Sequence, residues 1–571
     1  MQMRDFVVRF AGEGGQGVVT SAEGLAQAAT QVGYHALTFA TFPSQILGGP
    51  TWTQSRICTE PVLSPGDAAD VLVAFNREAY DSHKEEVRDG GVIIYNSSDF
   101  QLEEDPQSIG LAIDDLAKST GNTRAANMVV IGALAHLVNM PQKYLEEFVV
   151  KRFKRGRADD EQIIRSNIQA LTLGREQVAS SGFSLGDLAP PKPVEPNQLL
   201  LKGNEALALG ALAAGLDFYV GYPISPATTI LVFMERNLVG PGRFAYQVSS
   251  EIESITAILG AGFAGKKAMT ATAGPGFSLM GEGLGLGWMA EIPLVVVDVQ
   301  RGGPATGLPT KTEQSDLMAC MFPAHGDVKL PVIAVGSVEE CFYGAIKAVN
   351  WAERYQGPVI LMTEMSLAER AQNIPKPDLS KVVVENRLVY QGNNGYHRYQ
   401  GYELSPMPFP GTPGAYVANG SEHDEMGDTT HLPSRHIQMT ERRFSKIKLL
   451  EEDVYERENT QASVALMPWG GSKGPAREAY NQMVQLGLDV GWYYTMFLNP
   501  LPPKLLEELK QKELVIVPEL NYQGQFASIL RSYGVRAQAI TQYTGLPFKV
   551  IDLVKRVTEI TRLQSKEMVT A

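Results

Sequence analysis

Cysteine is scarce in this sequence. Only three cysteines occur among 571 residues, at Cys58, Cys320 and Cys341, and no two of them form a CxxC pair. This scarcity excludes a disulfide framework, an all-cysteine zinc site and an iron–sulfur cluster held by this chain alone. Four of the eight histidines fall between residues 397 and 436, but their spacings match no compact zinc template. We therefore expect no metal site in this chain, and any electron chemistry needs a metal centre on another chain.

Long apolar runs and an excess of positive charge are also missing. No uncharged apolar stretch reaches the ~18 residues of a membrane-spanning helix, and residues 1–6 lack the apolar core of a signal peptide. The 50 Lys and Arg residues against 63 Asp and Glu residues give a net charge of −13. A negative field of this kind repels phosphate backbones. We therefore expect a cytoplasmic protein that binds neither nucleic acid nor membranes.

What is present is the composition of an ordinary folded protein, with 44% hydrophobic residues, and a length that predicts roughly three or four domains. In region 1–188, apolar strands alternate with helices, which is typical of a parallel α/β sheet. The expected strands are 5–11, 35–42, 70–75 and 91–95, and the expected helices are 17–32 and 127–138. Four prolines between 189 and 196 then predict a stiff linker over 189–202.

Two further α/β regions follow the linker. In region 203–373 the expected strands are 217–224, 267–273, 293–300, 331–335 and 358–363. The pattern is lost in the polar segment 374–460, which is too long for an ordinary loop. In region 461–571 the expected strands are 464–468, 489–494 and 514–518, with a helix at 476–486. The predicted fold class is therefore α/β with three doubly wound units.

A glycine-rich loop stands between the first expected strand and the first expected helix. Its glycines are Gly12, Gly14, Gly15 and Gly17. The spacing satisfies GxGxxG, which allows a tight turn and lets the amides of a helix N-terminus attract a phosphate. No acidic residue lies between Glu23 and Glu60 to hold the ribose of a dinucleotide. A phosphate-bearing ligand such as coenzyme A is favoured over NAD, and a structural turn is the alternative. The basic run 151–157 either meets a nucleotide phosphate or is a solvated helix face.

A pair of acidic residues opens the buried helix that is expected to run to residue 264. Ser250 and Glu253 fit a capping box, so Glu253 has a structural task. Glu251 has none. It either complements the helix dipole or is an acid/base group with a raised pKa.

Two other motifs stand at the carboxyl ends of expected strands, where open α/β sheets bind their ligands. Residues 221–229 follow the first strand of the second region and read equally well as a capped helix start or as a binding loop. Arg301 ends a buried strand and needs an anionic partner. That partner is either a structural carboxylate or the carboxylate of a substrate.

Taken in order, these motifs resemble the α subunit of the 2-oxoacid:ferredoxin oxidoreductases, in the form with a γ domain fused at its N-terminus. The 2-oxoglutarate enzymes look most similar. Residues 13–21 look like the opening of the γ domain, while 203–206 and 222–226 look like the GNEA and YPITP motifs, with Ser225 in place of the usual threonine. The other stretches that follow the family pattern are 251–283, 307–317, 422–425 and 518–525.

The resemblance implies three domain types: a γ domain, a thiamine diphosphate pyrimidine-type domain and a transketolase C-terminal-like domain. It implies thiamine-diphosphate-dependent decarboxylation of 2-oxoglutarate, with transfer of the acyl group to coenzyme A and of electrons to ferredoxin; the physiological direction stays open. The diphosphate signature GDG is absent, since Gly326-Asp327 and Gly427-Asp428 lack the second glycine. A separate β subunit is therefore expected to carry that site, Mg²⁺ and a [4Fe–4S] cluster, in an (αβ)2 assembly.

The resemblance also implies site residues. Glu251 is expected to be the catalytic carboxylate that hydrogen-bonds N1′ of the aminopyrimidine. Arg301 is expected to hold the substrate's C1 carboxylate, and Lys311 its distal carboxylate. The remaining expected site residues are Ser225 and Thr228 for the substrate and Tyr222, Pro223 and Ile224 for the aminopyrimidine.

Two alternatives remain open from the sequence. The same machinery could act on pyruvate or on a branched-chain or aryl 2-oxoacid. The chain could also be a non-catalytic nucleotide-binding assembly subunit that uses only the N-terminal glycine loop. An assay of ferredoxin reduction with the β partner, run on several 2-oxoacids, separates all three hypotheses.

Overall fold

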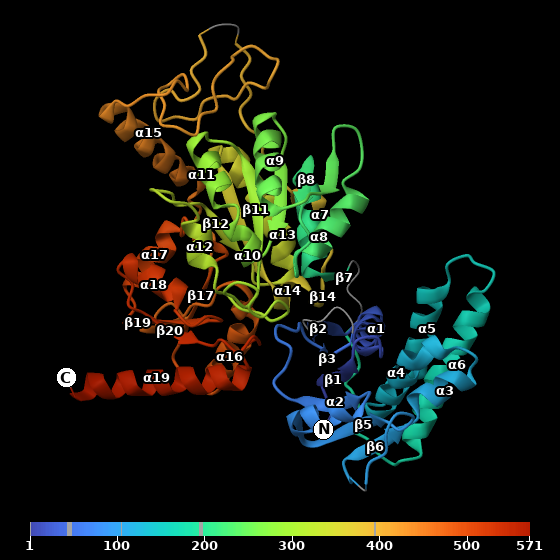
Figure 1. Cartoon of the computed structure of the whole chain (residues 1–571). Coiled ribbons are helices and arrows are strands. Elements are labelled where there is room, and N and C mark those ends of the chain that lie inside the picture. Colours follow the sequence, from blue (N-terminus) through green and yellow to red (C-terminus); the bar gives the residue numbers. More distant parts are fainter. Residues whose placement is uncertain (1, 43–47, 104, 193–197, 393–394, 571) are drawn as a thin grey trace. The chain divides into compact units, whose positions relative to one another are not determined.

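The computed structural model describes residues 2–42, 48–103, 105–192, 198–392 and 395–570. The chain forms two compact units, of which the first consists of Met1–Leu201 with Arg370–Lys376 and the second of Lys202–Glu369 with Pro377–Ala571. Both are built of sheets covered by helices, so the α/β class is confirmed (Figure 1). The finer five-part division stays a prediction, and residues 193–197 of its linker lie outside the described residues.

The first unit is built on one eight-stranded sheet, in the order β6-β5-β4-β1-β3-β2-β14-β7. Its strands are β1 (Asp5–Glu13), β2 (His35–Thr41), β3 (Pro50–Cys58), β4 (Ala69–Ala74), β5 (Val87–Asn96), β6 (Ser108–Leu111), β7 (Gln198–Lys202) and β14 (Ala371–Pro375). The expected parallel pairing holds for β1, β4, β5 and β6. Strand β3, which the sequence pattern misses, is antiparallel to both β1 and β2. It was missed because it carries buried Thr, Gln and Ser residues in place of an apolar run.

The main helices of this unit are α1 (Val18–Gln31), α2 (Arg77–His83), α3 (Ile113–Ser119), α4 (Ala126–Leu137), α5 (Gln142–Phe153) and α6 (Asp160–Ala179). Helices α4 and α6 pack backbone against backbone through two glycines. A Cβ atom on Gly132 would lie 2.0 Å from the carbonyl oxygen of Leu171, and one on Gly174 would lie 2.0 Å from that of Val129. Any larger residue at either position would push the helices apart.

The second unit contains a seven-stranded sheet in the order β18-β12-β13-β11-β10-β8-β9, with every pair parallel except that of β12 with β18. Its strands are β8 (Phe218–Gly221), β9 (Phe244–Gln247), β10 (Ala268–Thr272), β11 (Leu294–Gln300), β12 (Val332–Ala334), β13 (Pro358–Glu364) and β18 (Phe497–Asn499). Strand β11 is buried along its whole length, which explains its nearly continuous apolar sequence. Because β8, β10 and β11 are parallel, their carboxyl ends meet at one edge of the sheet.

Helices of this unit pack on that sheet. They include α7 (Gly203–Ala213), α8 (Thr228–Asn237), α9 (Glu251–Phe263), α10 (Gly274–Ser278), α11 (Gly281–Met289), α12 (Leu317–Met321), α13 (Val338–Tyr355) and α14 (Met365–Ala368). None of the helices in the described part of the chain combines the length and apolarity needed to cross a membrane.

A third sheet of five strands, in the order β15-β17-β16-β19-β20, completes the second unit. Its strands are β15 (Glu456–Glu458), β16 (Val464–Leu466), β17 (Gly491–Tyr494), β19 (Leu514–Glu519) and β20 (Ala537–Thr541), and its helices are α16 (Lys473–Gln485), α17 (Pro503–Lys510), α18 (Gln525–Ser532) and α19 (Val550–Thr570). One apolar cluster runs from the seven-stranded sheet into this one, joining Val296 and Leu317 to Trp469 and Phe526. The two sheets of this unit therefore share a core.

In the described part of the polar segment expected between residues 374 and 460, the one α-helix is α15 (Pro433–Ser445). Its buried side is formed by Met439, Arg442 and Arg443, and two arginines on that side give no apolar signal in the sequence. The fold holds this helix by charge instead.

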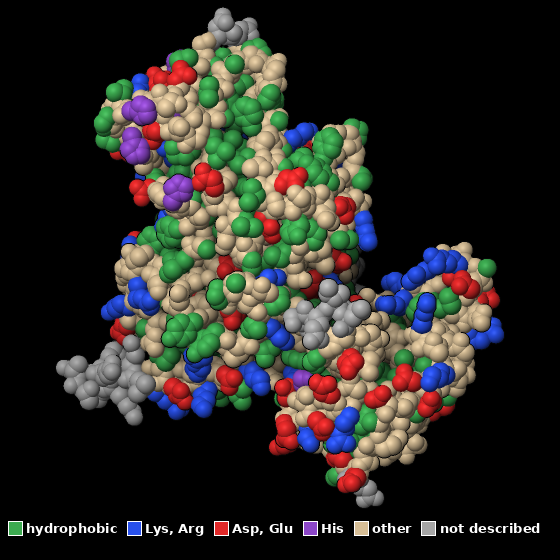
Figure 2. Space-filling view, in the orientation of Figure 1, with side chains coloured by type: hydrophobic (Ala, Val, Ile, Leu, Met, Phe, Trp, Pro, Cys, Tyr) green, Lys and Arg blue, Asp and Glu red, His purple; other side chains and the backbone are tan. Residues whose placement is uncertain are grey.

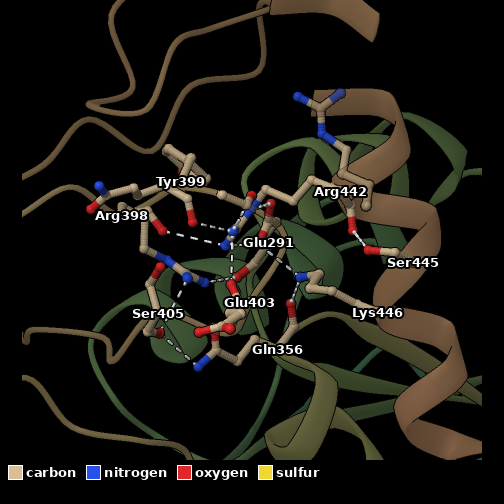
Figure 3. Close-up of polar contacts among 12 residues, drawn as sticks. Glu291, Gln356, Arg398, Tyr399, Glu403, Ser405, Arg442, Ser445 and Lys446 are labelled. Carbon is tan, nitrogen blue, oxygen red and sulfur yellow. Dashed lines mark hydrogen bonds and ion pairs between the residues drawn. The ribbon is translucent and has the colours of Figure 1, made fainter. Parts of the chain in front are cut away.

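An ion cluster around Glu291 anchors α15 and the neighbouring loop (Figure 3). The Glu291 carboxylate, 1% exposed, accepts from Arg442 Nε at 2.8 Å and from Lys446 Nζ at 2.8 Å. Arg398 donates to the backbone oxygen of Glu291 at 2.9 Å. Burial and the neighbouring Arg398 and Arg442 charges lower the Lys446 pKa to about 7, and the Glu291 carboxylate opposes that shift. One buried carboxylate thus faces three cations.

Replacement of Glu291 by glutamine should destabilise the second unit strongly. It removes the carboxylate that pairs with Arg442 and Lys446 and whose charge also acts on Arg398, and leaving a buried charge unpaired typically costs about 3–5 kcal/mol. Urea denaturation should show this loss. The matched control is Glu282→Gln, whose carboxylate is largely exposed beside His325 and whose loss should change the unfolding free energy by less than about 0.5 kcal/mol. Equal stability of the two variants would contradict the prediction.

Candidate functional site

Two sequence motifs meet at the carboxyl edge of the seven-stranded sheet. Strand β8 ends at Gly221 and leads into residues 222–226, while β11 ends at Gln300 and is followed by Arg301. The Arg301 guanidinium donates from Nη1 to the main-chain oxygen of Ser225 at 2.8 Å. The structure thus brings Arg301 and the 222–226 loop together, as the prediction of a shared site requires.

The 222–226 loop is held in place by a residue to which sequence reasoning gave no role of its own. Asn204, near the start of α7, donates from Nδ2 to the Pro226 oxygen at 2.9 Å and to Thr229 Oγ1 at 2.7 Å. Thr229 in turn donates to Glu369 at 3.3 Å. Asn204 is buried to 1% exposure, and only its position in the family-like motif at 203–206 could have pointed to it.

The other predicted residues of this loop lie at varied depths. Tyr222 is exposed, Pro223 and Ile224 are half-buried, and Ser225 is exposed. Thr228 is half-buried and begins α8. The loop therefore presents the exposed side chains of Tyr222 and Ser225 close to the backbone oxygen that contacts Arg301.

Glu251 is the first residue of α9 and is 6% exposed. The expected cap is confirmed, because Ser250 Oγ accepts from the Glu253 amide at 3.2 Å. The second hydrogen bond of the expected capping box is made to a different residue. The Glu253 carboxylate accepts from the amide of Ser249, one residue before the N-cap Ser250, at 2.7 Å. Glu251 takes no part in the cap, and no described side chain or amide donates to its carboxylate.

Short helix α10 passes directly beside the Glu251 carboxylate. A Cβ atom on Gly276 would lie 2.3 Å from Glu251 Oε1 and 2.1 Å from Thr272 Oγ1, so this position admits only glycine. Two residues earlier, a Cβ atom on Gly274 would lie 2.8 Å from Asp316 Oδ2. The bare backbone of α10 therefore separates two carboxylates at the edge of the sheet.

The Arg301 side chain is buried, with 7% exposure, and its Nε has no hydrogen-bond partner among the described residues. Burial lowers the pKa of this guanidinium, while the charge of Asp316 raises it. A guanidinium stays charged in proteins and presents several donors in a fixed fork. Part of that fork is therefore available to an anion.

Lys311 reaches the same region because the loop after β11 folds back on itself. The Leu308 amide donates to the Gly302 oxygen at 2.8 Å, and the Gly302 amide donates to the Lys311 oxygen at 3.1 Å. Burial lowers the pKa of the half-buried Lys311 ammonium. None of the ion pairs in the described part of the chain involves Lys311. Arg301 and Lys311 thus lie on one folded loop, the Lys311 side chain packs next to Gly545, and neither cation forms an ion pair with a carboxylate among the described residues.

The glycine loop of the first unit forms the expected turn between β1 and α1. Gly15 and Gly17 have φ angles of +99° and +88°, which favour glycine. Gln16 Oε1 pins the turn by accepting from the Glu13 amide at 2.7 Å and from Asn76 Nδ2 at 3.0 Å. Gly14 lies in the same turn, just before the amino end of α1, whereas Gly12 belongs to strand β1 and pairs with Thr51 of β3.

The basic run 151–157 lies at the end of α5 and in the turn that follows it. Figure 2 shows Lys and Arg side chains gathered on this part of the surface. Arg152 is hydrogen-bonded to Gln27 of α1, whereas Lys151, Lys154 and Arg157 are exposed. Most of the run is therefore solvated.

Two protein-family models match the chain. The model described as pyruvate flavodoxin/ferredoxin oxidoreductase, thiamine diP-bdg, matches residues 209–442, and the one described as pyruvate ferredoxin/flavodoxin oxidoreductase matches residues 7–177. The first match contains the edge with Glu251 and Arg301, and the second contains the glycine loop.

Similar proteins span nearly the whole chain. The 2-oxoglutarate oxidoreductase subunit KorA of Mycobacterium tuberculosis is 32% identical, over 96% of this chain and 90% of its own. The 2-oxoacid:ferredoxin oxidoreductase 2, subunit alpha, of Aeropyrum pernix is 29% identical over 98% of each chain. A solved structure of 2-oxoglutarate:ferredoxin oxidoreductase from Magnetococcus marinus, with 2-oxoglutarate, coenzyme A and succinyl-CoA bound, has a TM-score of 0.92 and 36% identity, covering 98% of this chain and 100% of that one.

Proposed function

This chain belongs to the 2-oxoacid:ferredoxin oxidoreductases, as an α subunit, and from that premise we propose that its substrate is 2-oxoglutarate. The proposed reaction decarboxylates 2-oxoglutarate, joins the succinyl group to coenzyme A and passes two electrons to ferredoxin. The observation that carries this choice is the pair of cations at the sheet edge. Arg301 and Lys311 both lack an ion-paired carboxylate among the described residues, and a dicarboxylate substrate supplies one carboxylate for each.

Thiamine diphosphate fits the residues around Glu251. A buried carboxylate without a described donor, beside a glycine backbone that leaves no room for a side chain, suits the edge of a planar ring. The cofactor, when bound, supplies the carbanion chemistry of decarboxylation. We assign Glu251 to hold the proton at N1′ of the aminopyrimidine, with Tyr222, Pro223 and Ile224 lining the ring.

Each cation has a distinct proposed role toward the substrate. Arg301 holds the C1 carboxylate, and its hydrogen bond to the Ser225 oxygen fixes the guanidinium plane. Ser225 and Thr228 offer hydroxyl groups beside that carboxylate. Lys311 meets the distal carboxylate, which distinguishes 2-oxoglutarate from pyruvate.

Other components are proposed to come from partners. A β subunit would carry the diphosphate site with Mg²⁺ and the [4Fe–4S] cluster, forming (αβ)2 with this chain and reducing ferredoxin. Two cysteines of this chain are buried and one is half-buried, and no group of three metal-ligating side chains exists in the described ranges; both facts support that division. The amides of Gly12, Gly14, Gly15 and Gly17 are proposed to bind a phosphate of coenzyme A.

The test of this function is ferredoxin reduction by the chain reconstituted with its β subunit, thiamine diphosphate and coenzyme A. We expect kcat/KM to be highest for 2-oxoglutarate in a panel with pyruvate, a branched-chain 2-oxoacid and an aryl 2-oxoacid. If kcat/KM is highest for another member of the panel, that 2-oxoacid is the substrate and the assignment of 2-oxoglutarate is wrong. Reduction with none of them would support the non-catalytic assembly role.

The substitution Lys311→Met should impair 2-oxoglutarate selectively. It keeps the length of the side chain and removes its charge, so the distal carboxylate loses a charged hydrogen bond worth about 1.5–3 kcal/mol. We expect kcat/KM for 2-oxoglutarate to fall about 10- to 100-fold, while that for pyruvate, which has no distal carboxylate, changes little. Steady-state kinetics on both substrates measure this ratio. Equal losses on the two substrates would show that Lys311 only supports the loop.

A further inference from the structure

The carboxyl groups of Asp298 and Asp316 lie near Arg301 in the sequence and the fold, and they have no role in the function proposed above. Asp298 projects from β11, three residues before Arg301, and is fully buried. Its Oδ1 has no partner among the described residues, and its Oδ2 accepts from Cys320 Sγ of α12 at 3.5 Å. Asp316, at the start of α12, has a buried and equally unpartnered Oδ2.

The structure fixes Asp316 next to the substrate end of β11. Its amide donates to Oε1 of Gln300, the residue before Arg301, at 3.2 Å. Its carboxylate lies against the backbone of α10 at Gly274, while Glu251 lies against the same helix at Gly276. Asp316 is therefore held between the Arg301 strand and the helix that borders the Glu251 carboxylate, where an incoming anion changes its electrostatic surroundings.

The charged and titratable neighbours of this pair lie in three segments. They are Arg301, directly after β11, Glu313 in the loop before α12 and Cys320 on α12, together with the two aspartates themselves. Helix α10, which packs against Asp316, carries no titratable residue. One cation thus faces three carboxyl groups in a poorly solvated space, and like charges this close do not all ionise.

Burial and the neighbouring Asp316 charge raise the pKa of Asp298 well above its usual range, so the neutral acid is the favoured form of this fully buried group. Burial and the Glu313 charge raise the pKa of Asp316 to about 6, while Arg301 opposes that shift. Asp316 therefore titrates close to neutral pH, and its carboxylate is the one whose charge acts on Arg301 in this chain.

We propose that Asp316 is a positioning residue that takes up a proton from solvent when the carboxylate of a 2-oxoacid binds Arg301. The arriving carboxylate replaces Asp316 as the anion beside Arg301, so the ionised form of Asp316 becomes costlier and a proton joins its carboxylate to give the neutral acid. Asp298, already neutral, keeps the pair from holding more than one negative charge. The inference rests on the proposed binding of the substrate carboxylate by Arg301.

The sign of the effect follows from linkage. Substrate binding raises the pKa of Asp316, so binding is strongest where Asp316 is already protonated, below about pH 6, and weakens as the pH rises. A difference of one pKa unit between the free and bound states corresponds to a tenfold change in affinity. We therefore expect the KM of the wild-type complex for 2-oxoglutarate to rise about tenfold between about pH 5.5 and 8.

The experiment measures kcat and KM for 2-oxoglutarate across this pH range in the reconstituted complex. Asp316→Asn keeps the shape and removes the charge, so its KM should be flat with pH and about tenfold below the wild-type value at about pH 8, with kcat little changed. Asp298→Asn should keep the wild-type profile because that group stays protonated. Asp327→Asn, an exposed aspartate, is the matched control and should also keep it.

A second measurement needs only the wild-type complex. Calorimetry of 2-oxoglutarate binding in two buffers of different ionisation enthalpy, with coenzyme A and ferredoxin omitted, should report uptake of on the order of one proton per site at neutral pH. A wild-type KM that does not vary with pH, no proton uptake, or an Asp316→Asn profile that matches the wild type would overturn the inference while leaving the proposed function intact. A wild-type complex inactive on every 2-oxoacid would instead refute the proposed function.

Discussion

The substitution Arg301→Lys should reduce kcat/KM for every 2-oxoacid by about 30-fold to several thousand-fold, which corresponds to about 2–5 kcal/mol. In the proposed binding mode, the C1 carboxylate of the substrate enters a poorly solvated edge of the sheet and must be paired there. Arg301 would meet it with a fork of donors whose plane is fixed by the 2.8 Å hydrogen bond to the Ser225 oxygen. An ammonium cannot hold that oxygen and grip two carboxylate oxygens in the same geometry.

The rank order of substrates should survive this change, because every 2-oxoacid carries the same C1 carboxylate. The matched control is Arg387→Lys, at the far end of α9, where the buried guanidinium is paired with Glu353 at 2.6 Å and also contacts the Gly262 oxygen. That variant should lose stability, but its folded fraction should keep normal kcat/KM. A near-normal kcat/KM for Arg301→Lys would show that Arg301 has only a structural role.

Glu251→Gln should lower turnover by about 10²–10⁴, the usual worth of a positioned acid/base group. Glutamine has the same shape and fits beside Gly276, but it cannot share a proton with the cofactor ring as a carboxylate does. Folding should be nearly unaffected, because Ser250 still caps the Glu253 amide and Glu251 makes no hydrogen bond in the cap. Steady-state kinetics and thermal unfolding of the same preparation separate the two effects.

Glu253→Gln provides the control two residues away. Glu253 is exposed, and its carboxylate accepts from the Ser249 hydroxyl and amide. Those two hydrogen bonds lower the pKa of Glu253. Its replacement should cost a fraction of the stability of α9 and leave turnover nearly normal. If Glu251→Gln unfolds while its folded fraction retains full specific activity, Glu251 is a helix-capping residue and its assigned role is wrong.

The sequence alone predicted the elements whose signal is local. Strands β11 and β13 are buried on both faces and therefore appear as short continuous apolar runs. The glycine loop shows in the sequence because Gly15 and Gly17 adopt positive φ angles that other residues avoid. The separation of Glu251 from Glu253 also came from local rules, since a helix cap involves only neighbouring residues. The order of such motifs along the chain was enough to indicate the family.

Tertiary structure alone decided the features that join distant parts of the chain. Strand β14 enters the first sheet by pairing Gln372 with Leu37, and the segment around α15 is held by the charges that meet at Glu291. No local pattern encodes a pairing across hundreds of residues. Arginine is usually a surface residue, so the sequence does not show that an arginine is buried until its partner is known.

The same division applies to the site. The sequence by itself determined which residue types stand at the carboxyl ends of β8 and β11, because strand ends and glycines leave a local signal. Only the fold decided that Arg301 lies on the Ser225 oxygen and that Asp316 lies against Gly274. The physical reason is that the pKa of a group depends on the charges and solvent around it, and whether a donor finds a partner depends on which groups pack against it. Both are set by packing between segments far apart in the chain.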